Sequence, residues 1–208
     1  NFYIHIPFCR QRCPYCKFAL TPVFDEAKKR RYIAYLKEEI RGYFLSFSEG
    51  ESLSEKNRSS LRKDDKTEIS TVYFGWGTPS VLSHDELLSI LEFFPDYRSA
   101  SEITLESNPE DITEDYVRGL FDLGITRLSM WVQTVNDASL KEIHRSSKKR
   151  IYEALESIEV ALLSFSEGES LPDGKRSSLR KDDKKSETSI NVDFILGLPY
   201  TLPGETLE

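Results

Sequence analysis

The three cysteines of the chain, Cys9, Cys13 and Cys16, lie within a span of eight residues. Their C-x3-C-x2-C spacing lets one short loop present three thiolates to a single cluster. A cubane cluster needs a ligand at each of its four irons, so three cysteines leave one iron open. An open iron can chelate the amine and carboxylate of S-adenosylmethionine (SAM). The residues alone leave two alternatives, a structural zinc site completed by His5 and unrelated buried thiols.

The composition limits the class of protein. The chain has 208 residues, of which 38% are hydrophobic and 30% charged, a balance typical of one soluble globular domain. A formal net charge of -7 without a dense Lys/Arg patch argues against nucleic acid or an anionic membrane as a partner. We expect no membrane span, because no uncharged apolar stretch approaches about eighteen residues. Clustered cysteines suit a metal site in a reducing compartment, which predicts a cytoplasmic protein.

Strand and helix signals alternate along the chain. Strands are predicted at residues 2–6, 71–74, 102–106, 127–132 and 191–196. Helices are predicted at residues 25–43, 85–94, 114–123 and, as a broken stretch, 138–162. Ser83 and Glu86 are spaced as a capping box, and Thr113 is placed as an N-cap. This order predicts an α/β fold whose parallel sheet curls into part of a barrel, with ligands bound where the strands end.

Two nearly identical polar segments interrupt this order, at residues 45–66 and 163–184. They match at 18 of 22 positions, and each holds five acidic and five basic residues. Such a composition cannot bury enough apolar surface to offset its ordering entropy, so we expect two mobile loops. Both follow a helix and precede a strand, which predicts a place on the rim opposite the ligand site. They are either tolerated insertions or a docking surface.

Five motifs lie at the ends of the predicted strands. They are YIHIPFCRQRCPYCKF (3–18), GWGTPS (75–80), ITLESNPED (103–111), GITRLSMWVQTVND (124–137) and NVDFILGLPYTLPGET (191–206). In this order they closely resemble the oxygen-independent coproporphyrinogen III oxidase family of radical SAM proteins. The resemblance implies about five of the six strand–helix units of that barrel, a [4Fe-4S] cluster on the three cysteines, and SAM. Residues 1–208 should form this core alone, since the family's C-terminal accessory domain cannot be fitted before Glu208.

The resemblance also implies which residues contact SAM. They are Tyr3, Gly77, Thr78, Glu106, Gln133, Arg145, Asp193 and Ile195. A glycine such as Gly77 lets the backbone approach a ligand closely. The planar, charged fork of Arg145 suits the SAM carboxylate, and Glu106 or Asp193 could accept hydrogen bonds from the amine or the ribose.

The three histidines have plainer interpretations. By alternation, His5 shares a face with Tyr3, which makes it either a barrel-interior histidine near the cluster or a hydrogen-bonded core residue. His84 follows a predicted cap and is expected to be solvated. His144 precedes Arg145 and is expected only to shape that turn.

Two glycines of the family pattern are tryptophans in this chain. Where the family resembles GGGTP and SxGVQ, the chain has Trp76 and Trp131. Glycine at such points marks an unusual backbone geometry or a close approach by a ligand, so an indole would crowd the site and weaken SAM binding. Alternatively, the rings pack against the helices or line a wider pocket for a flat macrocycle.

Phe18 separates two branches of the family. The oxidase branch resembles a pattern with a further cysteine at this position, whereas the heme chaperone branch resembles CPYCxF, as residues 13–18 read. The favoured hypothesis is therefore a protein that binds heme and transfers it to apo-proteins. The alternatives are a coproporphyrinogen III oxidase of porphyrin biosynthesis, which would act on a tetrapyrrole with an electron donor, and a catalytically impaired or truncated scaffold.

Overall fold

The computed structural model describes most of the chain. The residues outside the description are 18, 20, 23–24, 50–68, 168–187 and 195–208. Ile195, one of the residues predicted to contact SAM, therefore lies outside the described residues.

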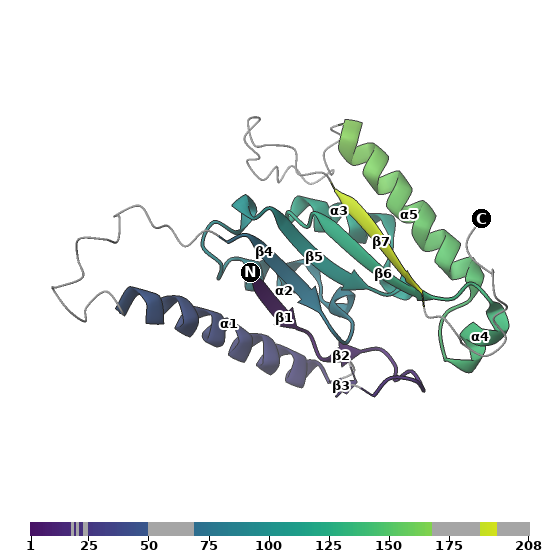
Figure 1. Cartoon of the computed structure of the whole chain (residues 1–208), viewed down its shortest axis with the longest axis horizontal. Coiled ribbons are helices and arrows are strands. Elements are labelled where there is room, and N and C mark those ends of the chain that lie inside the picture. The colour runs from purple at the N-terminus through teal and green to yellow at the C-terminus, as the bar shows by residue number, and fades with distance from the viewer. Residues whose placement is uncertain (18, 20, 23–24, 50–68, 168–187, 195–208) are drawn as a thin grey trace.

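A five-stranded parallel sheet lies at the centre of the molecule (Figure 1). Its strands lie side by side in the order β1 (Phe2–His5), β4 (Thr71–Gly75), β5 (Glu102–Ser107), β6 (Arg127–Gln133) and β7 (Ser189–Phe194). Every neighbouring pair is parallel, which confirms the predicted α/β sheet. Within the described residues the sheet is not closed, because β1 and β7 form its two edges, as expected for part of a barrel.

The helices begin close to the predicted positions. Those that the structure describes are α1 (Glu26–Glu49), α2 (His84–Leu91), α3 (Glu114–Asp122), α4 (Asp137–Glu142) and α5 (Lys148–Glu167). The capping box at α2 is confirmed, since Ser83 Oγ accepts from the Glu86 N–H at 3.2 Å and the Glu86 carboxylate accepts from the Ser83 N–H at 2.9 Å. Thr113 caps α3 as predicted, and the broken stretch is divided into α4 and α5.

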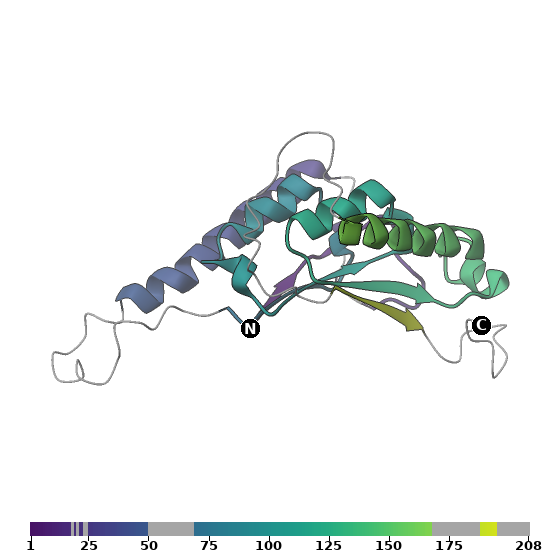
Figure 2. The same cartoon turned by 90° about the horizontal axis from the view of Figure 1, so that it is seen from above.

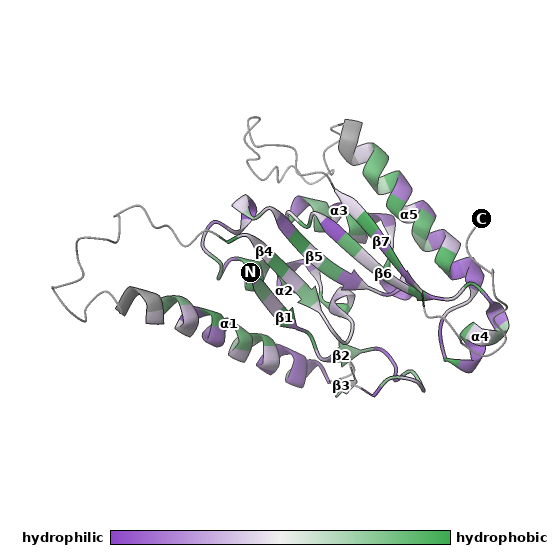
Figure 3. Ribbon diagram, in the orientation of Figure 1, coloured by the Kyte–Doolittle hydropathy of each residue, from purple (hydrophilic) through white to green (hydrophobic). Residues whose placement is uncertain are grey.

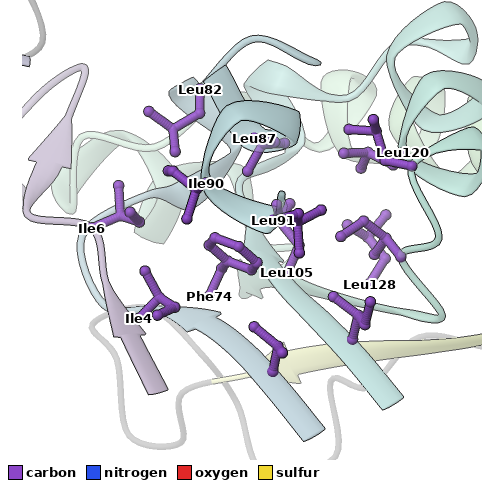
Figure 4. Packing of buried hydrophobic residues seen from close by; sticks show 14 of the residues in the cluster. Ile4, Ile6, Phe74, Leu82, Leu87, Ile90, Leu91, Leu105, Leu120 and Leu128 are labelled. Atoms are coloured by element: carbon purple, nitrogen blue, oxygen red, sulfur yellow. The ribbon is translucent and has the colours of Figure 1, made fainter. Parts of the chain in front are cut away.

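The helices lie along one face of the sheet (Figure 2). Side chains on this face of the strands, including Ile4, Phe74 and Leu105, meet apolar side chains of the helices, including Leu87 and Leu91 (Figure 4). These residues are at most 4% exposed, and burying each contributes about 1.5–3 kcal/mol. Apolar and polar residues alternate along the helices, so each presents an apolar side to this core (Figure 3). The other face of the sheet is left for polar side chains.

A short parallel pairing was not predicted. β2 (Phe8–Cys9) pairs with β3 (Thr21–Pro22), and the Thr21 N–H donates to the Pro7 carbonyl at 2.8 Å. Two-residue strands leave no periodic signal in a sequence. The pairing ties both ends of the cysteine loop together.

The start of each polar insert is helical. Residues 45–49 continue α1 and residues 163–167 continue α5, so the expectation of a mobile loop is wrong for these five residues of each copy. Both copies begin LSFSE, and the preceding helices extend through them because a helix that is already formed adds residues at little cost. The remainder of each insert, residues 50–66 and 168–184, lies outside the described residues. α1 and α5 end on the side of the sheet where the strands begin, away from the cysteine loop (Figure 1).

Candidate functional site

A cavity of about 820 Å³ lies beneath the cysteine loop, on the sheet face without helices. Nine of the eleven residues predicted for the site line it: Cys9, Cys13, Cys16, Gly77, Thr78, Glu106, Gln133, Arg145 and Asp193. Tyr3 lies outside the lining and stacks on Tyr73, which does line the cavity, with 5.6 Å between ring centroids. The structure thus brings together residues that are up to 184 positions apart, from Cys9 to Asp193.

The cysteine loop is fixed against the rest of the site at several points. Cys13 is buried, Cys9 and Cys16 are half-buried, and all three are free thiols. A tight turn joins the last two, since the Cys16 N–H donates to the Cys13 carbonyl at 3.0 Å. The loop is anchored from outside by an ion pair between Arg10 and the buried Asp111 carboxylate. These contacts hold the three thiols at the mouth of the cavity.

The electrostatic surroundings couple the thiols to one another. Burial raises the pKa of the Cys9 thiol, the 3.2 Å contact with Thr78 Oγ1 opposes that shift, and the neighbouring thiols of Cys16 and Cys13 raise it further. Burial also raises the pKa of Tyr15, which hydrogen-bonds to Cys13. A metal cluster would favour the thiolates by its positive charge.

The donor set suits a cluster better than a single ion. Within the described residues, no three His, Cys, Asp or Glu side chains converge closely enough to hold one metal ion. The His5 ring instead lies 5.2 Å from the Trp76 ring, so it does not complete a zinc site with the cysteines. A cubane cluster places each cysteine on a different iron and does not require its ligands to converge on one point. The three thiols on one loop therefore fit an iron–sulfur cluster.

Asn108 links the cysteine loop to the far wall of the cavity, and the sequence prediction missed it. Its Nδ2 donates to Thr78 Oγ1 at 2.9 Å, and Thr78 in turn contacts Cys9 Sγ. Its Oδ1 accepts from Arg145 Nη2 at 2.6 Å, and the same nitrogen donates to the Trp131 carbonyl at 2.6 Å. The signal for Asn108 was its place two residues after the predicted strand at residues 102–106, within the motif ITLESNPED. A continuous chain of contacts thus runs from Cys9 to β6.

The carboxylate of Glu106 is held on both oxygens. Tyr73 Oη donates to Oε1 at 2.7 Å, and the Trp76 N–H donates to Oε2 at 2.8 Å. Burial raises the pKa of Glu106, the two hydrogen bonds oppose this shift, and the nearby Asp193 raises it again. Asp193 is itself bound by Ser129 Oγ at 2.8 Å and lies across the sheet from Glu106. Two carboxylates therefore face the cavity.

A glycine is required at position 77 by the backbone of a neighbouring segment. A Cβ at this position would lie 2.3 Å from the Ile6 carbonyl oxygen and 2.9 Å from the Phe8 carbonyl oxygen. The turn that carries Thr78 therefore packs directly on the segment that leads to Cys9. The structure thus adds a close approach of two chain segments at Gly77, which also lines the cavity, and the predicted contact with a ligand stays a prediction.

The two tryptophans occupy different surroundings. Trp76 has φ 71°, the left-handed conformation in which glycine is favoured, and its ring packs on His5 without lining the cavity. Trp131 lies in β6 with its ring at the cavity wall. Trp131 is thus the tryptophan that could crowd a ligand or line a wider pocket, whereas Trp76 takes the glycine-type backbone and packs its ring on His5.

Two of the histidine interpretations are changed or extended by the structure. His84 was expected to be solvated, but its ring stacks on Tyr116 with 5.0 Å between centroids and its Nε2 lies 2.9 Å from the Tyr116 carbonyl oxygen. It packs α2 against α3 over Gly119, where a Cβ would meet the imidazole at 2.3 Å. His144 is exposed with φ 55°, and its carbonyl accepts from Gln11, so this turn also anchors the cysteine loop.

The fold and this site define an α/β cofactor-binding protein with a cysteine loop after the first strand of a partial parallel barrel. The model of the radical SAM superfamily matches residues 3–162, and the chain therefore belongs to that superfamily. Its members in general use SAM and a [4Fe-4S] cluster.

Named relatives come from two groups. The chain is 29% identical to the heme chaperone HemW of Lactococcus lactis over 99% of this chain and 42% of the relative. It is 28% identical to HemW of Haemophilus influenzae over 100% of this chain and 46% of the relative. It is 34% identical to the oxygen-independent coproporphyrinogen III oxidase of Helicobacter pylori J99, over 70% of this chain and 29% of the relative. The chain thus spans less than half the length of these relatives.

A solved structure supports the same assignment. Coproporphyrinogen III oxidase (HemN) from Escherichia coli, described as a radical SAM enzyme, superposes with a TM-score of 0.66 at 25% identity. The match covers 99% of this chain and 39% of that chain. This confirms the fold as part of a radical SAM barrel. Among the described residues, no helix is long and apolar enough to cross a membrane.

Proposed function

We propose that this chain is a radical SAM protein that binds heme and passes it to apo-proteins. The observation that carries the proposal is the gathering of three thiols and six further predicted residues around one cavity. Two features support a heme carrier over an oxidase: Phe18 stands where the oxidase branch resembles a fourth cysteine, and a heme chaperone matches almost the whole chain. The relatives are much longer than this chain, so their activity is only proposed for it.

The residues around the cavity have distinct roles in this proposal. Cys9, Cys13 and Cys16 would hold the [4Fe-4S] cluster. When bound, the cluster supplies an open iron for SAM and the electron that cleaves it. Arg145 lines the cavity, and its side chain is only 5% exposed; it would pair with the SAM carboxylate through the donors that Asn108 and Trp131 do not use.

The acidic side of the cavity suits the rest of SAM. Glu106 and Asp193 would accept hydrogen bonds from the amine or the ribose hydroxyls, since both carboxylates line the cavity. Gln133 is 4% exposed and also lines it, at the end of β6, where it would add a polar contact. Tyr3 would act indirectly, by positioning the ring of Tyr73, which lines the cavity.

A second candidate is an oxygen-independent coproporphyrinogen III oxidase that takes a tetrapyrrole substrate and an electron donor. The observation that favours it is the 34% identity to the oxidase of Helicobacter pylori J99, which exceeds the identity to the heme chaperones.

Anaerobic reconstitution with iron and sulfide, followed by dithionite reduction and an assay for 5'-deoxyadenosine, separates these functions. Formation of 5'-deoxyadenosine together with decarboxylation of coproporphyrinogen would indicate the oxidase. A cluster with heme binding and transfer to an apo-protein, without decarboxylation, supports the carrier. Failure to assemble any cluster would contradict both functions and favour an impaired scaffold.

SAM binding is tested with a matched pair of arginine variants. Arg145→Lys removes the planar fork and is expected to weaken SAM binding about tenfold, which corresponds to 1.4 kcal/mol. Arg41→Lys is the control, because Arg41 is exposed on α1, pairs with Glu38 and does not line the cavity. Equal SAM affinity in both variants, measured by calorimetry on the reconstituted protein, would contradict the assigned role of Arg145.

A further inference from the structure

Four rings lie together at the β1 edge of the open sheet face, and we call them the ring platform: Tyr3, His5, Tyr73 and Trp76. Tyr3 and His5 alternate with the buried Ile4 along β1, so both point away from the helices. Tyr3 lies opposite Tyr73 in the register of β1 and β4. Trp76 follows directly on β4, whose last residue lies opposite His5. The sequence analysis did not predict that these four rings form a group.

The ring platform consists of two ring pairs on either side of Gly75. Tyr3 stacks on Tyr73 at 5.6 Å, and His5 packs on Trp76 at 5.2 Å between centroids. Between the pairs lies Gly75, where a Cβ would meet Tyr73 Cε1 at 2.7 Å and Tyr3 Oη at 2.9 Å. The tyrosine rings therefore lean over the glycine toward the second pair. Tyr3 is 54% and Trp76 36% exposed, so the platform is open on its outer side.

Trp76 has an unfavourable backbone conformation at its place in the ring platform. Its φ of 71° is a left-handed conformation that residues with a side chain rarely adopt and glycine adopts readily. The Glu106 carboxylate fixes this conformation through the Trp76 N–H at 2.8 Å. A side chain held in such a conformation is a reason to look for a functional role at this position. What the chain gains there is a large apolar ring against the His5 imidazole.

His5 is suited to bind a metal. Burial lowers its pKa, which favours the neutral imidazole that coordinates metals. The ring nitrogen of His84 is occupied by the Tyr116 carbonyl, and His144 lies on an exposed turn at the other end of the site. His5 therefore combines a ligating nitrogen with neighbouring aromatic rings and an open face.

A cation completes the surroundings. Arg127 lies in the same row of the sheet as Tyr73, two strands away, or about 10 Å across the sheet. Its positive charge acts on the Tyr73 hydroxyl, and its side chain is 34% exposed with only a 3.6 Å pairing to Glu102. An imidazole, apolar rings and a cation together match a flat macrocycle with a central metal and carboxylate side chains.

We propose that the ring platform binds heme, with His5 as an axial iron ligand, the rings of Tyr3, Tyr73 and Trp76 as its apolar wall, and Arg127 as the partner of a propionate. This inference rests on the proposed function and assigns the place of its ligand. Imidazole nitrogen is a usual ligand of heme iron. Tyr73 and Arg127 also line the cavity, so heme on the platform would lie against the SAM site, while the cluster keeps its own ligands, the three cysteines.

The test measures heme affinity of the chain after cluster reconstitution, which occupies the cysteines, because thiolate is also a heme ligand. Bound heme is quantified as pyridine hemochrome after desalting, and the axial ligand is identified by electron paramagnetic resonance. His5→Ala is expected to weaken heme binding by about tenfold or more and to remove the imidazole signature. Trp76→Gly, which relieves the backbone, should weaken binding about 2- to 10-fold. His144→Ala is the control and should bind heme like the wild type.

Each outcome decides a separate point. Heme binding by His5→Ala with unchanged affinity and signature would overturn the ring platform while leaving heme carriage intact. No heme uptake by the wild type would overturn both the platform and the proposed function. Repeating the titration with all three cysteines changed to serine removes the cluster; retained His5-dependent binding there supports the platform even if the chain fails as a radical SAM protein. Circular dichroism shows whether each variant is folded.

Discussion

Replacing Gly77 by alanine adds one methyl group at the point where the turn after β4 packs on the segment before the cysteine loop. The new Cβ would lie 2.3 Å from the Ile6 carbonyl oxygen, 2.9 Å from the Phe8 carbonyl oxygen and 3.0 Å from the Phe8 nitrogen. All three atoms are backbone, so no side-chain rotation relieves the contact. The two segments must move apart, and overpacking of this kind costs about 1–3 kcal/mol.

The cost should appear both in stability and in cluster assembly. For a chain of this size, each kcal/mol lowers the melting temperature by about 2–4 °C, so a fall of roughly 2–12 °C is expected. Separation of the segments also displaces Thr78 from Cys9, which are 3.2 Å apart, so iron and sulfide content after reconstitution should fall as well. Calorimetry and iron analysis measure the two effects on the same sample.

Gly42→Ala is the matched control for this prediction. A Cβ at Gly42 would meet nothing within 4 Å, and the residue lies inside α1 on an exposed side. There the same methyl group should raise stability by about 0.5–1 kcal/mol, because glycine inside a helix is unfavourable. If Gly77→Ala were as stable as the wild type and assembled a full cluster, the backbone contact would not be what fixes this turn.

Two further predictions concern the hydrogen-bonded walls of the cavity. Asn108→Ala removes one hydrogen bond of the buried Thr78 hydroxyl and one of Arg145; at about 0.5–1.5 kcal/mol each, unfolding by urea should show a loss of about 1–3 kcal/mol, and SAM binding should weaken. Burial raises the pKa of Glu106, so its contribution to stability is full below the ordinary value of 4.5 and is lost as the pH rises through the raised value. Glu106→Gln should therefore gain stability relative to the wild type over that pH range, measured by thermal unfolding.

Each of these has a result that contradicts it. Asn108→Asp keeps an acceptor for Arg145 but no donor for Thr78, so a loss equal to that of Asn108→Ala would assign the whole effect to Thr78, while no loss in either variant would refute the link. For Glu106, a stability difference between wild type and variant that stays constant with pH would show that its carboxyl does not titrate differently on folding.

The local features of the chain were determined by the sequence. The apolar period of the helices, the alternation of the strands and the polar residues at Ser83 and Thr113 act between near neighbours, and the structure confirms the elements that they predict. The cysteine spacing is also local, because one short loop carries all three thiols. The family motifs located the cavity residues, since each motif follows a strand and parallel strands end on the same rim.

Contacts between distant parts of the chain were decided only by the tertiary structure. Gly77 meets the backbone of residues 6–8, and Asn108 joins Thr78 to Arg145. These partners are too far apart in the sequence for a periodic pattern to link them. The left-handed backbone of Trp76 depends on the Glu106 carboxylate, which lies 30 positions further along the chain. Sequence patterns report what a residue prefers near its neighbours, whereas packing selects which partner it meets. The ring platform is an example, because its rings come from two strands that only the folded sheet places side by side.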